Sequence, residues 1–134
     1  KHNSSIYGEQ QIDKRKAQVN KFIKLHYKRM PGTSKLADEY LEKIAKYCND
    51  NGINLFLLDM PFDPYYRMDT PKIHKEKHKE LLSKLKLVYD LEYINYNSCY
   101  DNNLSLMKDG GHPSWYGAAL LSNEIKDVLK DQKN

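Results

Sequence analysis

The segment from Asp109 to His112 places a carboxylate and an imidazole on either side of two glycines. Such a pair suits base-assisted nucleophilic catalysis. The carboxylate accepts one ring N–H and fixes the tautomer, so that the other ring nitrogen can take a proton from a hydroxyl. The glycines permit backbone angles that other residues avoid, and Pro113 and Ser114 are residue types that begin helices. The spacing therefore predicts a tight loop that presents Asp109 and His112 as catalytic residues, with an ordinary capping loop as the alternative.

Three further side chains could contact a substrate. Asp63 and Arg67 lie in the Pro-rich segment 61–67, directly after an apolar stretch. Loops at the carboxyl end of a strand are where open α/β sheets bind ligands. We favour the alternative that Asp63 and Arg67 pair with each other, because ion pairs are common in surface loops. Trp115 could line the substrate pocket, and a core or interface position is its alternative.

Histidines and cysteines give no convincing metal site. His74 and His78 stand four residues apart, a spacing that can bind a metal on one helix face. However, no acidic residue directly follows His74, and no third ligand is evident. We therefore expect these histidines at the core boundary, with no metal and no cofactor. Cys48 and Cys99 lack metal-ligand spacing and are too few for a disulfide framework.

Hydrophobic periodicity predicts helices and strands that position these residues. The helices are expected over residues 9–30, 34–51, 71–87 and 115–130, and the strands over residues 53–60 and 91–96. The predicted apolar face of the second helix comprises Ala37, Tyr40, Leu41, Ile44, Ala45 and Cys48. That of the last helix comprises Ala118, Leu121, Ile125, Val128 and Leu129. The first strand is almost continuously apolar and should be buried on both faces, as in a parallel sheet covered by helices.

The order α-α-β-α-β-α predicts a single domain over residues 1–134 with a layered α/β architecture. A short parallel sheet would be flanked by helices. Two strands make a poor sheet for four helices to cover. Either further amino-terminal strands lie before Lys1, or short pieces such as residues 3–7 complete the sheet, or two chains pair their strand edges as a homodimer.

Asp109-Gly-Gly-His112-Pro113, followed by an aromatic residue, Gly117 and a closing amphipathic helix, resembles the last block of the SGNH (GDSL-type) hydrolases and acyltransferases. From Tyr40 onward the chain is similar to the carboxyl-terminal part of the D-alanyl transfer proteins of teichoic-acid modification. The resemblance implies a flavodoxin-like, SGNH-like fold in which Asp109 and His112 complete a triad with a serine. The Gly-Asp-Ser block, the oxyanion glycine and the asparagine block of that family have no convincing match here. We therefore expect an incomplete copy of the full fold, with the nucleophile outside this chain.

The chain carries 22 Lys and Arg against 18 Asp and Glu, a formal net charge of +4. The basic residues gather in the first and third predicted helices, where lysines usually form solvated faces. If they have a partner, an anionic polymer or lipid head groups fit, and no nucleic-acid-binding motif is present. The sequence has neither an apolar run long enough to cross a membrane nor a signal-peptide pattern.

We therefore expect an acyl-transfer or ester-hydrolysing domain. His112 would act as general base toward a serine hydroxyl and then as general acid toward the leaving group, with Asp109 orienting it. The resemblance implies a cell-envelope polymer ester as substrate, an acyl donor as partner and an extracytoplasmic, membrane-associated or secreted location. The alternative is a non-catalytic module that keeps the loop as a structural cap and binds an anionic partner through its basic helices.

Overall fold

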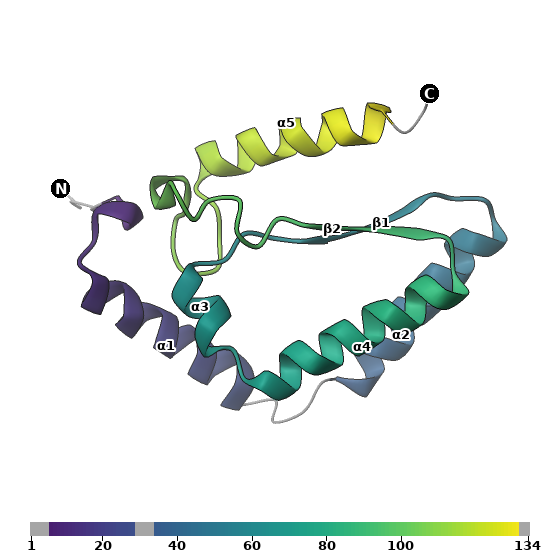
Figure 1. Ribbon diagram of the computed structural model, residues 1–134, viewed down its shortest axis with the longest axis horizontal. Coiled ribbons are helices and arrows are strands. Elements are labelled where there is room, and N and C mark those ends of the chain that lie inside the picture. Colours follow the sequence, from purple (N-terminus) through teal and green to yellow (C-terminus); the bar gives the residue numbers. More distant parts are fainter. Residues whose placement is uncertain (1–5, 29–33, 132–134) are drawn as a thin grey trace.

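The computed structural model describes residues 6–28 and 34–131 (Figure 1). The α-helices of this part are α1 (Ile12–Lys28), α2 (Lys35–Asp50), α3 (Pro64–Asp69), α4 (Lys72–Val88) and α5 (Trp115–Asp131). Its strands are β1 (Leu55–Asp59) and β2 (Leu91–Asn95), and its 3₁₀ turns are η1 (Tyr7–Glu9) and η2 (Leu104–Leu106). Among the described helices, none combines the length and the apolar character needed to span a membrane.

β1 and β2 pair in parallel, which confirms the predicted strand pairing. The register runs from Leu55 opposite Leu91 to Asp59 opposite Asn95, so both strands end at the same edge of the sheet. Figure 1 shows α5 on one side of the strand pair, and α2 with α4 on the other. The structure thus has the predicted α/β character, with a short two-stranded parallel sheet flanked by helices.

The prediction that β1 is buried on both faces is wrong. Each of its residues is only half-buried, although four of the five are apolar. The reason is that the described sheet has two strands, so the flanking helices cover only part of β1. Ile53 and Met60, which were expected within the strand, lie outside it and are 48% and 41% exposed.

α2 begins at the capping residue Ser34. Ser34 Oγ accepts a main-chain N–H of the first turn at 3.2 Å, and Gly52 follows the helix with a φ of +64°. Ala45 is buried in a core cluster with Leu85 of α4 and Leu91 of β2. α2 is therefore held against the sheet through one narrow part of its surface.

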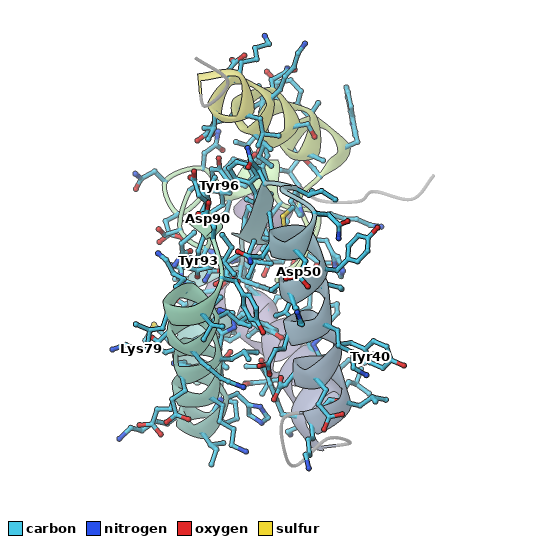
Figure 2. The ribbon with its side chains drawn as sticks, turned by 90° about the vertical axis from the view of Figure 1, so that its right-hand side faces the viewer. Tyr40, Asp50, Lys79, Asp90, Tyr93 and Tyr96 are labelled. Carbon is cyan, nitrogen blue, oxygen red and sulfur yellow. The ribbon has the colours of Figure 1, made fainter. Side chains whose placement is uncertain are left out.

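Much of the apolar face predicted for α2 is exposed. Tyr40 and Ile44 are 56% and 50% exposed, and Figure 2 shows Tyr40 pointing away from α4, which lies alongside α2. Leu36 and Tyr47 continue the row with 62% and 63% exposure. These four residues recur at helical spacing and form one exposed row, which we call the α2 stripe. The expectation that Tyr40 and Ile44 lie in the core is wrong, because no described element covers this side of α2.

A second core cluster lies beneath α5. Its buried members are Leu121, Tyr7, Tyr96, Tyr100 and Met107. Two other α5 residues that were expected to be buried, Ala118 and Leu129, are exposed. The prediction for Ala118 and Leu129 is wrong, because α5 lies against the sheet and η2 along a narrower face than the periodicity indicates.

The amino-terminal part differs from the prediction at its boundary. α1 begins at Ile12, because Tyr7–Glu9 form the 3₁₀ turn η1, and Ile12 is 53% exposed rather than part of an apolar face. Tyr7 is therefore not in a strand, and residues 3–5 of the suggested strand lie outside the described residues. Arg15 and Val19 of α1 are buried.

Candidate functional site

His112 and Asp109 are hydrogen-bonded to each other. Nδ1 of His112 lies 2.9 Å from Oδ1 and 3.1 Å from Oδ2 of Asp109. An ionised carboxylate can only accept, so Nδ1 is the donor, and Nε2 keeps a free lone pair in the neutral ring. The His112 side chain is 64% exposed and that of Asp109 is 24% exposed. The imidazole is therefore accessible, whereas the carboxylate that orients it is largely covered.

Main-chain hydrogen bonds close the loop around this pair. The Lys108 N–H donates to His112 O at 2.8 Å, and Met107 pairs with Pro113 in an antiparallel bridge. Asp109 Oδ1 also accepts the N–H of the second glycine at 2.9 Å. The Asp109 carboxylate is thus fixed by the same loop that carries His112.

The start of α5 is held against η2. The Ser114 N–H donates to Leu106 O at 2.7 Å, and Ser114 Oγ caps α5 by accepting the Gly117 N–H at 3.1 Å. The Tyr100 hydroxyl donates to Gly117 O at 2.6 Å. A Cβ on Gly117 would lie 2.2 Å from Leu106 O, so only glycine permits this close approach.

The glycines of the loop serve close packing rather than unusual backbone angles. Neither Gly110 nor Gly111 has a positive φ, so the expectation of special backbone angles is wrong. A Cβ on Gly110 would lie 2.8 Å from Val19 Cγ2 and 3.3 Å from the Tyr7 hydroxyl oxygen. Gly110 is therefore required because the loop lies directly against α1 and η1.

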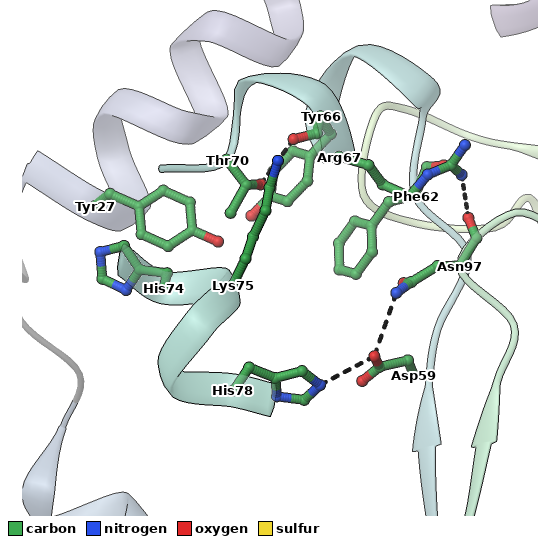
Figure 3. Close-up of a pocket in the computed structure, with 10 residues that line it drawn as sticks. All are labelled: Tyr27, Asp59, Phe62, Tyr66, Arg67, Thr70, His74, Lys75, His78 and Asn97. Carbon is green, nitrogen blue, oxygen red and sulfur yellow. Dashed lines mark hydrogen bonds and ion pairs between the residues drawn. The ribbon is translucent and has the colours of Figure 1, made fainter. Parts of the chain in front are cut away.

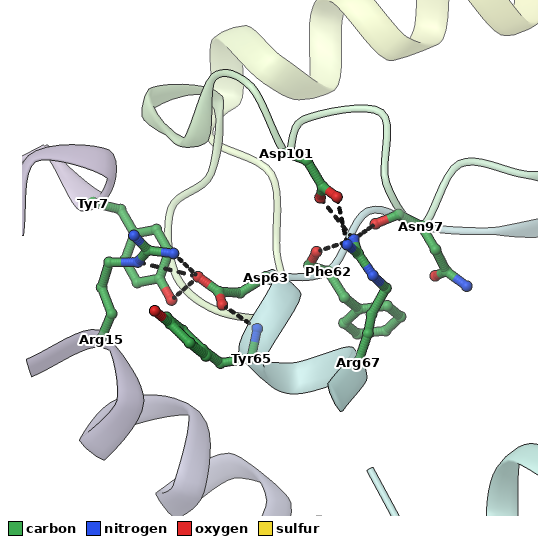
Figure 4. Close-up of polar contacts among 8 residues, drawn as sticks. All are labelled: Tyr7, Arg15, Phe62, Asp63, Tyr65, Arg67, Asn97 and Asp101. Carbon is green, nitrogen blue, oxygen red and sulfur yellow. Dashed lines mark hydrogen bonds and ion pairs between the residues drawn. The ribbon is translucent and has the colours of Figure 1, made fainter. Parts of the chain in front are cut away.

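Asp63 is fully buried and joins four segments of the chain (Figure 4). Its Oδ2 accepts the Tyr7 hydroxyl at 3.0 Å and the Arg15 Nε and Nη2 donors at 3.2 and 2.7 Å. Its Oδ1 accepts the Tyr65 N–H at 2.7 Å, which caps α3. The Asp63 N–H donates to Gly110 O at 3.0 Å, so this buried residue also positions the Asp109–His112 loop.

Asp63 and Arg67 do not pair with each other, so the favoured interpretation of this segment is wrong. The burial of Asp63 also removes it as a substrate contact. Arg67 instead bonds both carboxylate oxygens of Asp101, at 2.8 and 2.5 Å. It also donates to the main-chain oxygens of Phe62, at 2.9 Å, and of Asn97. Arg67 thus ties the loop after β2 to the loop after β1.

No serine hydroxyl in the described part of the chain is hydrogen-bonded to the His112 ring. Ser114 Oγ caps α5, and Ser105 Oγ donates to Asn103. The neighbour of the His112 ring is Phe22, at a centroid separation of 6.1 Å. The described residues therefore place an accessible imidazole against a carboxylate, and no serine hydroxyl among them is hydrogen-bonded to that imidazole.

Trp115 is 85% exposed, so a core position for it is wrong. Its ring contacts Tyr116 at a centroid separation of 5.9 Å. Trp115 begins α5, three residues after His112, and stands at the surface beside the loop.

A second Asp–His pair, which the sequence did not reveal, lies in a pocket of about 470 Å³ at the carboxyl edge of the sheet (Figure 3). Asp59 is the last residue of β1, and its Oδ2 lies 3.1 Å from His78 Nε2. The Asn97 amide donates to the same oxygen at 3.2 Å. The Tyr93 hydroxyl also donates to this oxygen, in a shorter hydrogen bond. The available signal was the place of Asp59 at the end of an apolar strand.

Two tyrosines near this pocket are firmly protonated. Burial raises the pKa of Tyr93, and the hydrogen bond to Asp59 and the charge of Asp59 raise it further. Burial also raises the pKa of Tyr66, with a smaller contribution from Tyr27. Both phenols therefore act as hydroxyl groups at neutral pH.

His74 and His78 have different partners. The His74 ring packs against Tyr27 at a centroid separation of 4.3 Å, whereas His78 bonds Asp59. Among the described residues, no group of three or more His, Cys, Asp or Glu side chains is arranged to hold a metal ion.

Comparison of the chain with protein-family models, with curated proteins and with solved structures gave no match.

Proposed function

We propose that Asp109 and His112 are the acid–base pair of an acyl-transfer or ester-hydrolysis site whose serine nucleophile is not among the identified contacts of this chain. The observation that supports this proposal is the bond from His112 Nδ1 to the Asp109 carboxylate, combined with the exposure of the ring. This geometry selects the Nδ1–H tautomer and directs the basic Nε2 away from Asp109.

The chemistry follows from that tautomer. Nε2 of His112 takes the proton of a serine hydroxyl as the serine oxygen attacks the ester carbonyl. The imidazolium that forms is stabilised by the Asp109 carboxylate and then returns its proton to the leaving alcohol. In the second half, Nε2 takes a proton from water or an acceptor hydroxyl as its oxygen attacks the acyl carbonyl. The imidazolium then returns that proton to the serine oxygen as the acyl–serine bond breaks.

The substrate and the location belong to the same proposal. The similarity of the Asp109-Gly-Gly-His112-Pro113 segment to the SGNH hydrolases and acyltransferases supports an acyl ester on a cell-envelope polymer, at an extracytoplasmic site. The SGNH-like version of the fold, with further strands beside β1, is proposed on the same basis.

The tautomer is testable in this chain by long-range ¹H–¹⁵N correlation NMR of the histidine rings. At a pH where the ring is neutral, we expect His112 to carry its proton on Nδ1. In Asp109→Asn, the neutral amide oxygen accepts the Nδ1–H more weakly than the carboxylate does, so we expect a smaller fraction of the neutral ring to carry its proton on Nδ1. Asp127→Asn, at an exposed position of α5, should leave the His112 tautomer unchanged. A wild-type ring protonated on Nε2 would contradict the orienting role of Asp109.

The activity is tested in the complete translation product of the gene that encodes this chain, with p-nitrophenyl esters of short acyl groups. We expect His112→Ala to lower kcat about 10²–10⁴-fold, the contribution of a general base. His26→Ala removes another surface imidazole and should keep wild-type activity. A His112→Ala protein with full activity, or a complete product that hydrolyses none of the esters, would overturn the proposal. The 134-residue chain alone should be no faster than its own His112→Ala variant.

A further inference from the structure

The pocket at the carboxyl edge of the sheet is separate from the Asp109–His112 pair, since neither residue lines it. Phe62 lies between them, because it lines the pocket and also neighbours Gly111. A volume of about 470 Å³ is in the range of small-molecule sites, and the carboxyl ends of parallel strands are where such sites form. A ligand bound in this pocket would therefore be distinct from a substrate of the Asp109–His112 pair.

The formal charges at the pocket balance once Asp101, the partner of the lining residue Arg67, is counted with the side chains that line it. Arg67 is neutralised by its bidentate pair with Asp101. Lys75 and Asp59 then contribute one positive and one negative charge. A site that selects a strongly charged ligand shows an excess of the opposite sign. This balance favours a ligand without net charge.

The pocket offers both an acceptor and a donor. Oδ2 of Asp59 receives the Tyr93, Asn97 and His78 donors, whereas Oδ1 has no hydrogen-bond partner among the described residues. Lys75 Nζ donates to a main-chain oxygen at 3.1 Å and has two further protons. A ligand that satisfies both groups must donate to a carboxylate and accept from an ammonium group. Hydroxyl groups do both.

Aromatic rings form the sides of the pocket. Phe62 and Tyr66 stack at 4.6 Å with an interplanar angle of 11°, and Tyr27 packs against His74. Figure 3 shows Tyr27 and His74 on one side, Phe62 on the other, and the Asp59–His78 pair below them. Such rings provide large, stiff apolar surfaces above a polar floor. A sugar ring has the matching form, with apolar C–H faces and hydroxyls around its rim.

We propose that this pocket binds a neutral sugar ring, with Asp59 Oδ1 accepting from its hydroxyls and Lys75 donating to them. The aromatic side chains Phe62, Tyr66 and Tyr27 contact the C–H faces of the ring. The sugar can come from a glycan or from a nucleoside, since both present the same hydroxyl chemistry. The site is independent of the acyl-transfer proposal, because binding uses neither His112 nor Asp109.

The binding is tested by titrating the ¹⁵N-labelled chain with methyl glycosides of glucose, galactose, mannose and N-acetylglucosamine, and separately with adenosine. We expect at least one probe to shift the amide resonances of Asp59, Phe62 and Asn97 in a saturable manner. Saturation by a methyl glycoside assigns the ring to a glycan, and saturation by adenosine alone assigns it to a nucleoside. His112→Ala should bind with the wild-type Kd.

Variants identify the groups that make the contact. Phe62→Leu removes an aromatic wall and Lys75→Met removes the donor, and each should raise Kd about tenfold, equivalent to roughly 1.4 kcal/mol. Phe56→Leu makes the same substitution in β1 outside the pocket and should leave Kd unchanged. The proposal is overturned if no probe shifts the pocket resonances, or if the shifts map to another surface. It is also overturned if acetate or inorganic phosphate saturates the pocket while the sugars do not.

Discussion

Asp63 links the loop of the candidate site to the buried part of the molecule. It forms a buried ion pair with Arg15, with side-chain exposures of 0% and 11%. Removing one partner of such a pair leaves an uncompensated buried charge and typically costs about 3–5 kcal/mol. An exposed pair such as Lys46–Asp50 contributes far less, because water screens the two charges. The Asp109–His112 loop therefore depends on a residue that cannot itself touch a substrate.

Tyr7 gives this network a pH dependence. Burial raises the pKa of Tyr7, and the charge of Asp63 and its hydrogen bond raise it further. A pKa raised by folding contributes stability that is complete below the unfolded value, near 10, and is lost as the pH rises toward the folded value. We expect the free energy of unfolding to fall above about pH 10. Tyr7→Phe lacks this titrating phenol. Its free energy of unfolding should therefore fall less steeply with pH than that of wild type, by about 1.4 kcal/mol per pH unit.

Urea unfolding followed by circular dichroism at a series of alkaline pH values measures this slope. Tyr116→Phe removes an exposed phenol and is expected to keep the wild-type dependence. Identical slopes for Tyr7→Phe and wild type would show that Tyr7 does not couple folding to proton binding.

Sequence separation explains which side-chain contacts could be foreseen. Asp109 and His112 are three residues apart, so a tight loop alone brings them within reach of each other. The Arg15–Asp63, Asp59–His78 and Arg67–Asp101 contacts span 48, 19 and 34 residues. These contacts depend on how helices and loops pack, which residue spacing does not contain. For this reason the sequence suggested Asp63 and Arg67 as partners, whereas each bonds a distant residue.

Among the elements, α5 and η2 approach each other too closely for a side chain at Gly117. A Cβ on Gly117 would lie 2.2 Å from Leu106 O, which is main chain and cannot move aside cheaply. We expect Gly117→Ala to lower the free energy of unfolding by about 1–3 kcal/mol, as overpacking does, although alanine favours helix. Urea denaturation measures the change.

Gly111→Ala is the matched control for this substitution. Its added Cβ would meet Phe62 at 3.6 Å, an ordinary contact, so we expect a smaller loss of stability. A Gly117→Ala protein as stable as wild type would contradict the close approach of α5 to η2.

The sequence predicted the long helices and both strands, but it missed the short helix α3. Strong periodicity indicated α2, α4 and α5, and the apolar runs indicated β1 and β2. α3 was missed because six residues are too few to show a period, although Asp63 and Pro64 are typical of a helix start. Periodicity also identifies the apolar side of a helix but not what covers it, so the exposure of the α2 stripe could not be predicted.

At the scale of the whole molecule, the described elements leave a large apolar area uncovered. The α2 stripe and the half-buried strand β1 contribute to it. Apolar patches of this kind are rare on monomeric proteins and mark association surfaces. We expect the chain to self-associate with rising concentration in sedimentation equilibrium, and the double variant Tyr40→Lys, Ile44→Lys to shift the equilibrium at least tenfold toward monomer.

Leu87→Lys tests whether any loss of exposed apolar surface has the same effect. Leu87 is 86% exposed on α4 and lies outside the α2 stripe, so this variant should associate like wild type. A chain that stays monomeric at every concentration, or a double variant that associates unchanged, would exclude the α2 stripe as the contact.

The hydrogen bond from the Asp63 N–H to Gly110 O has a consequence for cooperativity. Its donor is in a fully buried residue, so solvent deuterium reaches this amide only when the surrounding core opens. The opening free energy measured by hydrogen exchange at the Asp63 amide should therefore approach the free energy of global unfolding. Amides in a loop that frays independently would show a much smaller opening free energy. The orientation of His112 would then persist as long as the molecule is folded, and would be lost in a single step with the fold rather than by gradual local loosening.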